Sequence, residues 1–216
     1  MKYKLAIFDM DGTILNTIDD LAASLNYVLE KSGFPARTMD EVISFIGNGL
    51  RKLIERGVPE GTDSETVDKV LADFKEYYVV HCADKTAPYD GIIELLGNLR
   101  RNGCLTAVVS NKADDAVQEL CRKYFDGLFD YAVGERSGIL RKPAPDSVNE
   151  VLEKLNVSRE NAVYIGDSDV DIKTAENAGM DSIIVEWGFR ERDFLLKKGA
   201  KTIVSAPEEI EDIVLG

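Results

Sequence analysis

The sequence predicts an α/β protein with a Rossmann-like parallel sheet core, helices on both faces and a small α-helical unit inserted after the first strand. Short apolar runs rich in Val and Ile alternate with segments of helical periodicity, as in parallel strands joined by crossover helices. The alternation breaks between residues 15 and 83, where the apolar spacing is helical. We therefore expect a core domain formed by residues 1–14 and 84–216, and a helical domain formed by residues 15–83.

The expected strands are short apolar runs, most of which end at a polar or glycine-containing turn. They cover residues 5–8, 105–109, 162–165, 182–185 and, more weakly, 202–204. Helical spacing indicates helices over residues 113–124 and 146–155. Ser147 and Glu150 have the spacing of a capping box, so we expect them to begin the second of these helices.

Composition excludes several classes of protein. The 216 residues carry a formal net charge of −13, which argues against nucleic-acid binding because such proteins present basic patches. Three cysteines without a CxxC pair indicate free thiols in a reducing compartment. The first apolar stretch reaches Asp9 too soon for a signal peptide, and no window approaches the ~20 apolar residues of a membrane helix. We expect a cytoplasmic protein without a membrane partner, either a monomer or a homodimer.

The first chemically suggestive segment follows the first expected strand. Asp9 and Asp11 lie two residues apart, so both carboxylates can face one ligand, and Gly12 permits a sharp turn before Thr13. A nucleophile and an acid–base partner could lie side by side here. An isolated pair of this kind is as often a solvated turn.

Two further segments follow the second expected strand and precede the helix at 146–155. Ser110, Asn111 and Lys112 offer a hydroxyl and main-chain amides suited to a phosphate oxygen, although Ser-Asn is also a common helix cap. Lys142 precedes Pro143 in a stiff loop that would hold an ammonium group in place, and a plain rigid loop is the alternative.

A fourth segment has the composition of a metal site. Asp167, Asp169 and Asp171 alternate after an apolar run, and several carboxylates suit a divalent cation. An EF-hand is excluded because its sixth and twelfth positions would be Ile172 and Ala178 instead of Gly and Glu. Mg²⁺ needs fewer protein ligands and fits better.

Each segment follows an expected strand or lies at a neighbouring turn, and the carboxyl ends of parallel strands meet at one edge of a sheet. Taken together, the segments resemble the haloacid dehalogenase-like hydrolase superfamily over essentially the whole chain. Within it, the sequence is most similar to the phosphoglycolate phosphatases, which carry a Gly-Asn-Gly stretch in a helical cap. Here that stretch is Gly47-Asn48-Gly49.

The resemblance implies a role for each of these residues. Asp9 would attack phosphorus, and Asp11 would protonate the leaving alcohol and later activate water. Mg²⁺ would be held by Asp9, the main-chain carbonyl of Asp11 and Asp167, with Asp171 nearby or acting through water. The resemblance assigns the phosphate oxygens to Gly12, Thr13, Ser110, Asn111 and Lys142, and the leaving group to Gly47, Asn48, Gly49 and Arg51 in the cap.

The expected activity is Mg²⁺-dependent hydrolysis of a small phosphomonoester, with 2-phosphoglycolate as the leading substrate, through an aspartyl-phosphate on Asp9. A sugar-phosphate phosphatase, a pyrophosphatase and a β-phosphoglucomutase-like enzyme remain open. A non-enzymatic alternative is a receiver-type switch phosphorylated on aspartate. Such switches run to ~120 residues in a single compact domain. They also lack a helical insert, and Asp11 would speed the loss of the phosphoryl group.

Overall fold

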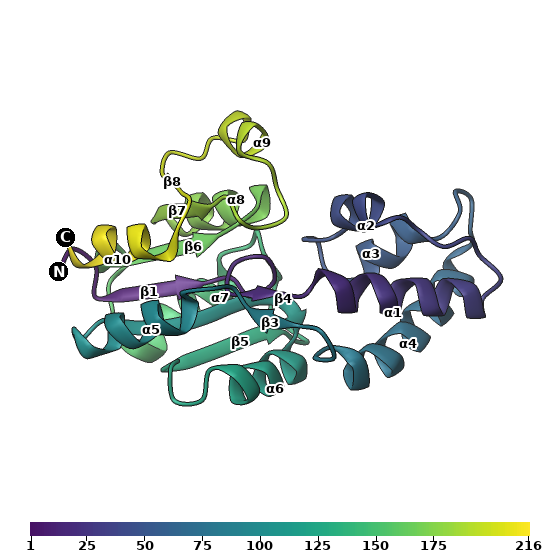
Figure 1. The fold of residues 1–216 in the computed structure, drawn as a ribbon, viewed down its shortest axis with the longest axis horizontal. Coiled ribbons are helices and arrows are strands. Elements are labelled where there is room, and N and C mark those ends of the chain that lie inside the picture. Colours follow the sequence, from purple (N-terminus) through teal and green to yellow (C-terminus); the bar gives the residue numbers. More distant parts are fainter. The chain divides into compact units, whose positions relative to one another are not determined.

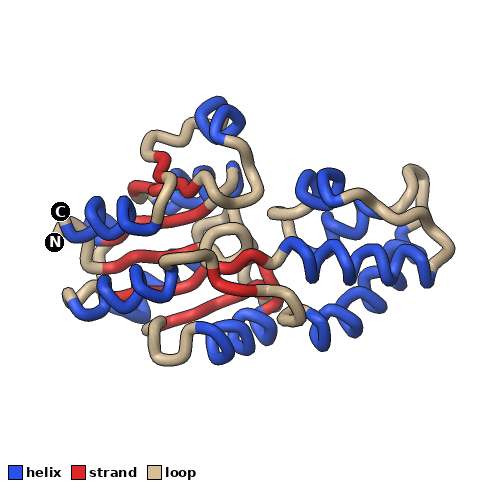
Figure 2. The backbone as a smooth tube through the Cα atoms, in the orientation of Figure 1, coloured by secondary structure: helices blue, strands red, loops and turns tan.

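The computed structural model describes residues 1–216, which form two compact units (Figures 1 and 2). The core unit comprises Met1–Asn16 and Pro88–Gly216, and the helical unit comprises Thr17–Ala87. Two short strands, β2 (Leu15–Asn16) and β3 (Ala87–Pro88), pair where the chain leaves and re-enters the core unit. The domain boundaries expected from the sequence remain a prediction, since compactness does not test whether either unit folds alone.

The core unit is built on a six-stranded parallel sheet in the order β5-β4-β1-β6-β7-β8. The strands are β1 (Leu5–Phe8), β4 (Leu105–Ala113), β5 (Tyr131–Glu135), β6 (Ala162–Gly166), β7 (Asp181–Val185) and β8 (Ile203–Val204). All four residues of β1 are buried, as expected for a central strand covered on both faces.

Helices cover both faces of this sheet. Buried apolar side chains of α7 and α8 pack on one face against β1, β4, β5 and β6. Helices α5 and α10 contact each other and lie on the opposite face, in front of the sheet in Figure 1. The core helices are α5 (Ile92–Arg101), α6 (Asp114–Tyr124), α7 (Asp146–Leu155), α8 (Asp169–Ala178), α9 (Arg192–Lys197) and α10 (Pro207–Leu215), with a 3₁₀ turn at Arg159–Asn161.

The helical unit contains α1 (Ile18–Lys31), α2 (Met39–Phe45), α3 (Leu50–Gly57) and α4 (Ser64–His81). Helices α1 and α4 pack together through the apolar faces that the periodicity predicts. Asp20, buried in α1, closes the unit: its carboxylate accepts the main-chain N–H groups of Lys85 and Thr86 at 2.8–3.0 Å. No helix of the protein is long and apolar enough to cross a membrane.

The predicted fold class is confirmed, and three local expectations need correction. The capping box expected at Ser147 is absent: α7 occupies the expected residues Asp146–Leu155, Pro145 is at the N-cap position, and no side chain caps the helix. Residues Ser110 and Asn111 do not form a turn before a helix. They belong to β4, which continues to Ala113 after a shift in its pairing with β5. The segment 15–83 is not purely helical, since it begins with β2.

The topology brings one edge of the sheet to the functional site. Strand β1 lies between β4 and β6, with Phe8 opposite Val108 and Ile165. The chain proceeds from β1 to one side through β4 and to the other through β6, so the carboxyl end of β1 is the point where the strand order reverses. Ligands of open α/β sheets bind at this point.

Candidate active site

Three buried aspartates meet just beyond the carboxyl ends of β1 and β6. Asp9 follows β1, Asp167 follows β6, and Asp171 lies in the first turn of α8. One carboxylate oxygen of each lies within 4.8 Å of the others. All three residues are at most 8% exposed, so little water screens their mutual repulsion.

One buried lysine partly neutralises this cluster. The Lys142 ammonium lies 2.7 Å from Asp9 Oδ1 and 2.8 Å from Asp171 Oδ1. It also donates to the hydroxyl of Tyr164 in β6 at 3.0 Å. Asn111 fixes the loop that carries this lysine: its side-chain amide accepts from Lys142 N at 2.9 Å and donates to Lys142 O at 3.1 Å. The second and third sequence segments are thereby joined.

Asp171 is the most fully bonded of the three acids. Its Oδ1 accepts from Lys142 and lies 3.2 Å from the Tyr164 hydroxyl, while its Oδ2 accepts from Ser168 Oγ at 2.6 Å and Ser168 N at 3.1 Å. The Ser168 hydroxyl in turn caps α8. Both oxygens therefore have donors, and this carboxylate holds Lys142 in place.

The pKa values of Asp9 and Asp167 are raised because these acids are buried beside other carboxylates. Burial, followed by the charge of Asp171, raises the pKa of Asp9 to about 7, although Lys142 opposes the shift. Burial and the charges of Asp171 and Asp9 hold the pKa of Asp167 well above its usual range. Burial by itself would lower the pKa of Lys142, but Asp171 and Asp9 outweigh it and raise that pKa.

The donor set fits a divalent cation. Four carboxylates, those of the cluster and Asp11, face two ammonium groups, so one such ion would balance the formal charge. The oxygen donors suit Mg²⁺. The carboxylate of Asp167 is held in place by a hydrogen bond, since Phe189 N donates to its Oδ2 at 2.8 Å.

Asp11 differs from the other acids in its surroundings. Its side chain is 24% exposed, and its Oδ1 lies 3.0 Å from Nζ of Lys112, whose side chain is only 2% exposed. The site thus contains two lysines, one bound to Asp9 and the other bound to Asp11.

The turn after Asp11 depends on glycine. Gly12 has φ +86°, and a side chain there would collide with the Asp167 carboxylate and the Phe189 ring. The next residue, Thr13, is fully buried, and its Oγ1 has no hydrogen-bond partner. Ser110 is 6% exposed, and its Oγ accepts from Lys112 N at 3.2 Å.

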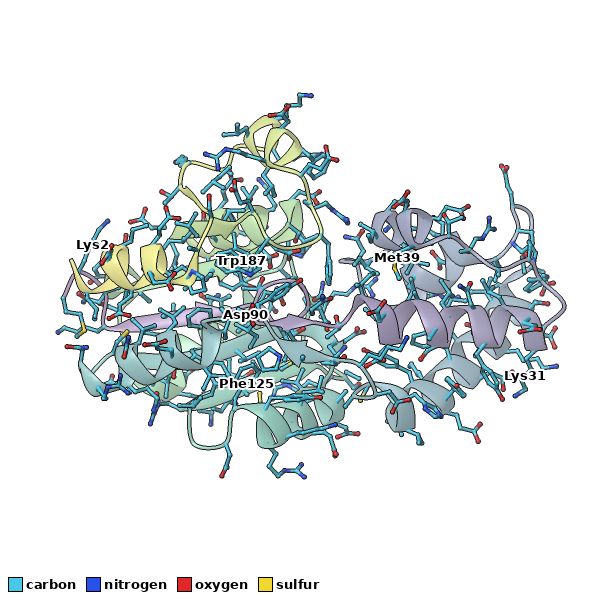
Figure 3. All side chains as sticks on the ribbon, viewed as in Figure 1. Lys2, Lys31, Met39, Asp90, Phe125 and Trp187 are labelled. Carbon is cyan, nitrogen blue, oxygen red and sulfur yellow. The ribbon has the colours of Figure 1, made fainter.

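Sequence reasoning missed a loop that braces this turn. After β7, Trp187 (labelled in Figure 3) donates from Nε1 to Thr13 O at 3.0 Å. A side chain at Gly188 would collide with Asp167 and with Gly12 O. A signal for this loop was available in the sequence. An aromatic residue and a glycine closely follow an expected strand, whose carboxyl end lies at the same edge of the sheet as the acidic cluster. Tyr164, concealed in an apolar strand, gave no signal.

The residues assigned to the cap lie in the helical unit, around the connection between α2 and α3. Gly47 and Gly49 both have positive φ, at +102° and +83°. Arg56 donates to Phe45 O at 2.7 Å and to Asn48 Oδ1 at 2.8 Å, so one guanidinium group bonds both ends of the loop. Arg51 is instead paired with Glu55 and Asp68 of its own unit.

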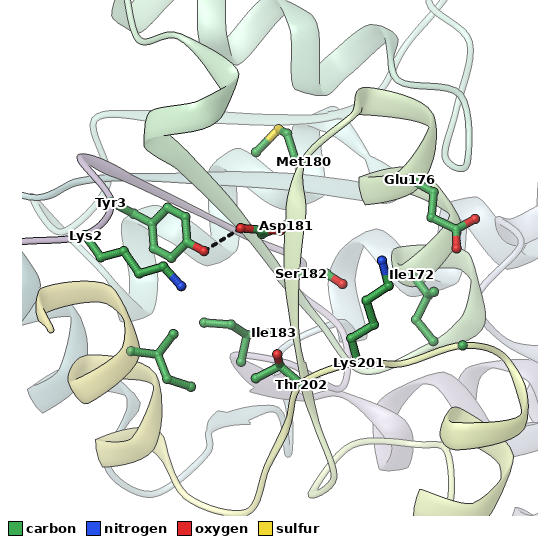
Figure 4. Close-up of a pocket in the computed structure, with 12 residues that line it drawn as sticks. Lys2, Tyr3, Ile172, Glu176, Met180, Asp181, Ser182, Ile183, Lys201 and Thr202 are labelled. Atoms are coloured by element: carbon green, nitrogen blue, oxygen red, sulfur yellow. Dashed lines mark hydrogen bonds between the residues drawn. The ribbon is translucent and has the colours of Figure 1, made fainter.

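A pocket of about 210 Å³ lies at the other end of the sheet (Figure 4). Its walls include the first residue of β7, Asp181, whose Oδ2 accepts from the Tyr3 hydroxyl at 2.7 Å. Amino ends of strands surround it, so it is separate from the acidic cluster.

Comparison with known proteins decides the family. Residues 6–185 match the sequence model described as haloacid dehalogenase-like hydrolase. The chain belongs to the haloacid dehalogenase-like hydrolase family. The expected family is thus confirmed, and the alternative of a receiver-type switch is set aside.

Several relatives of the chain within this hydrolase family are named as phosphatases. A phosphoglycolate phosphatase of Aquifex aeolicus is 32% identical over 86% of both chains. An N-acetylmuramic acid 6-phosphate phosphatase of Pseudomonas aeruginosa is 29% identical over 99% of this chain and 96% of its own. A crystal structure from Lactobacillus delbrueckii subsp. bulgaricus, provisionally assigned as a phosphoglycolate phosphatase, covers all of both chains at 45% identity with a TM-score of 0.96. Family and relatives together make this hydrolase a phosphoric monoester hydrolase.

Proposed function

We propose that this phosphatase hydrolyses 2-phosphoglycolate, using a divalent cation and a phosphoryl group carried on Asp9. The observation that carries the proposal is the buried arrangement of Asp9, Asp167 and Lys142 at the carboxyl end of β1. A carboxylate nucleophile, an ammonium group and oxygen ligands for a cation are brought together there, as phosphoryl transfer requires. The phosphoglycolate phosphatase relatives support the choice of substrate.

In the first step, a carboxylate oxygen of Asp9 attacks phosphorus while the ester P–O bond breaks. Asp11 gives its proton to the departing alcohol oxygen. In the second step, Asp11 takes a proton from water, the water oxygen bonds to phosphorus, and the bond to Asp9 breaks. Inorganic phosphate leaves, and both aspartates return to their starting states.

The remaining residues hold charge and geometry. Lys142 would bind a transferring oxygen, with Ser110, Thr13 and the main chain at Gly12 and Asn111 as further phosphate contacts. Asp9, Asp11 O and Asp167 would hold Mg²⁺, and Asp171, occupied by Lys142, would lie beside them. The cation supplies charge neutralisation between phosphate and nucleophile. In the helical unit, Gly47, Asn48 and Gly49 are the proposed selectivity residues, and we rank Arg51 below them because it is paired with Glu55 and Asp68.

A second candidate substrate class is sugar phosphates. The N-acetylmuramic acid 6-phosphate phosphatase relative, which aligns over almost the whole chain, favours it.

The test is steady-state phosphate release from 2-phosphoglycolate, sugar phosphates, pyrophosphate and an aryl phosphate, with Mg²⁺ and with chelator. We expect many turnovers, 2-phosphoglycolate far ahead, and loss of activity with chelator or in Asp9→Asn. If a sugar phosphate were hydrolysed faster than 2-phosphoglycolate, the second class would be the substrate class. Undiminished turnover by Asp9→Asn would refute the mechanism.

A further inference from the structure

We propose that Lys112 selects the substrate, because its ammonium group binds a carboxylate on the leaving alcohol. The proposal rests on the proposed phosphatase reaction and adds to it the reason for preferring an acidic ester. It concerns the core unit alone, where Lys112 and Asp11 both lie.

The position of Lys112 is fixed by the sheet. The residue lies near the end of β4, within the stretch between Val109 and Ala113 where the pairing with β5 shifts. A side chain at Gly134 of β5 would collide with the carbonyl of Lys112 and the start of α6, so the two backbones approach closely there. Only 2% of the Lys112 side chain is exposed, and it extends to Asp11. A buried, directed ammonium group of this kind is costly unless it meets negative charge.

The two lysines contact residues with different roles in the proposed reaction: one contacts the nucleophile, and the other contacts the acid that protonates the leaving group. Lys142 contacts Asp9, the proposed nucleophile, and therefore belongs with the phosphoryl group. Lys112 contacts Asp11, which delivers its proton to the ester oxygen of the leaving group. A group that touches Asp11 at 3.0 Å is close to whatever the leaving oxygen is attached to.

In 2-phosphoglycolate, the carboxylate is attached to the carbon that bears the ester oxygen. It is thus only two bonds away from the atom that Asp11 protonates. An ammonium group can donate three hydrogen bonds, so Lys112 can hold Asp11 and this carboxylate together. A neutral alcohol offers no charge at that position, and the charge-assisted bond is lost.

The competing explanation is that Lys112 only orients Asp11. Removing the lysine would then impair every ester equally, because every leaving group needs the same proton. Binding of a carboxylate by Lys112 predicts a loss that is larger for acidic esters than for neutral ones. The two explanations are separated by a pair of substrates that differ in charge and hardly in size.

The experiment compares 2-phosphoglycolate with 2-phosphoglycolamide in the wild-type enzyme, Lys112→Met and Lys112→Arg. We expect the wild type to prefer the acid by roughly 10- to 100-fold in kcat/KM, the usual effect of one hydrogen bond to a charged group. Lys112→Met should lose this preference, so that kcat/KM falls by roughly 10- to 100-fold more for the acid than for the amide, mainly through KM. Lys112→Arg should keep part of it, because it keeps the charge.

Lys173→Met, which removes an exposed lysine of α8 outside the site, is the matched control. It should leave kcat/KM unchanged for both substrates. Equal losses for acid and amide in Lys112→Met would overturn the proposal and leave the phosphatase function standing. If Lys112→Met does not fold, the wild-type comparison decides, since equal use of acid and amide refutes the proposal. A wild-type enzyme that hydrolyses no ester would refute the proposed function itself.

Discussion

The acidic cluster of the core unit and the 46–49 loop of the helical unit are held in different ways. In the cluster, Lys142 and Asp171 are 3% and 0% exposed, and their partners come from separate strands and loops. In the loop, Asn48 is bonded by the exposed Arg56, eight residues away on the adjoining helix. Buried networks fix one geometry, whereas short-range exposed bonds are replaced at little cost. The cluster is therefore suited to a reaction step that needs one fixed geometry. The loop is suited to the substrate selection that we propose for it, because its conformation can change at little cost.

The largest effect should follow from removing the ammonium group of Lys142, which lies within the acidic cluster. Lys142→Met leaves the buried carboxylates of Asp9 and Asp171 without their ammonium partner and takes away the charged contact that we propose for the transferring phosphate. We expect kcat to fall by at least about 100-fold, as when one preorganised donor is removed. Steady-state phosphate release measures this, with the exposed-lysine variant Lys154→Met as control. A fall below tenfold would contradict the fixed-cluster picture.

The second effect concerns pH and the cation. The pKa of Asp9 is raised from the 3.8 of a free carboxyl group to about 7, so the folded metal-free protein binds this proton more tightly than the unfolded chain. Its contribution to stability is complete below about pH 4 and is lost as pH rises towards 7. Because a cation needs the ionised form, we expect Mg²⁺ to raise Tm more at pH 8 than at pH 5.

Melting curves with Mg²⁺ and with chelator measure this second effect. Asp9→Asn cannot ionise at that position, so the pH dependence of the metal-free Tm should weaken in the variant. An equal Mg²⁺ shift at both pH values would show that the cluster does not couple protons to the cation.

A smaller effect is expected at Tyr164, whose hydroxyl accepts from Lys142. Tyr164→Phe should lower kcat by roughly tenfold and the free energy of unfolding by about 1–3 kcal/mol, because a buried donor loses its partner. Tyr3→Phe is a matched control: Tyr3 is also buried and bonded to a carboxylate, but beside the remote pocket. Stability measurements should show a lower free energy of unfolding in both variants. Kinetics should show a lower kcat in Tyr164→Phe only. Equal kcat values in both variants would exclude a positioning role for Tyr164.

The smallest effect on kcat should come from the 46–49 loop. Arg56→Met frees Asn48 and the Phe45 carbonyl, so we expect KM to change by roughly two- to tenfold, and unequally among substrates, while kcat stays within about twofold. Lys52→Met, which breaks an exposed ion pair with Glu55 outside this loop, should leave KM alone. Kinetics on the substrate panel measure the difference. A large uniform fall in kcat for Arg56→Met would remove the distinction between the two regions.

The sequence predicted the sheet, the helical insert and the acidic segments because each has a local signature. The strand at 5–8 is a continuous apolar run, and Asp9 and Asp167 follow apolar strands directly. Strand order then brings those ends together without further information. Roles of the individual side chains remain predictions until they are tested.

The sequence could not predict how the side chains connect. Tyr164 looks like any other apolar strand residue, and only the packing shows its hydroxyl beside Lys142. Trp187 reaches Thr13, 174 positions away, and no local pattern encodes that distance. Ser147 illustrates the opposite error: its capping-box spacing is correct, but the N-cap position is held by Pro145, two residues earlier. Terminal residues of helices depend on weak, easily replaced bonds.

The strand that carries Asp9 is made first and paired late. Leu5 has Leu105 and Ala162 as its sheet neighbours, so β1 has both partners only after more than 150 further residues have been joined. At synthesis rates of roughly 5–20 residues per second, this interval is roughly 8–30 s. The helical unit, continuous from Thr17 to Ala87, is fully synthesised before either partner strand. During translation, β1 is therefore an apolar segment that remains without its sheet neighbours until β4 and then β6 have been made.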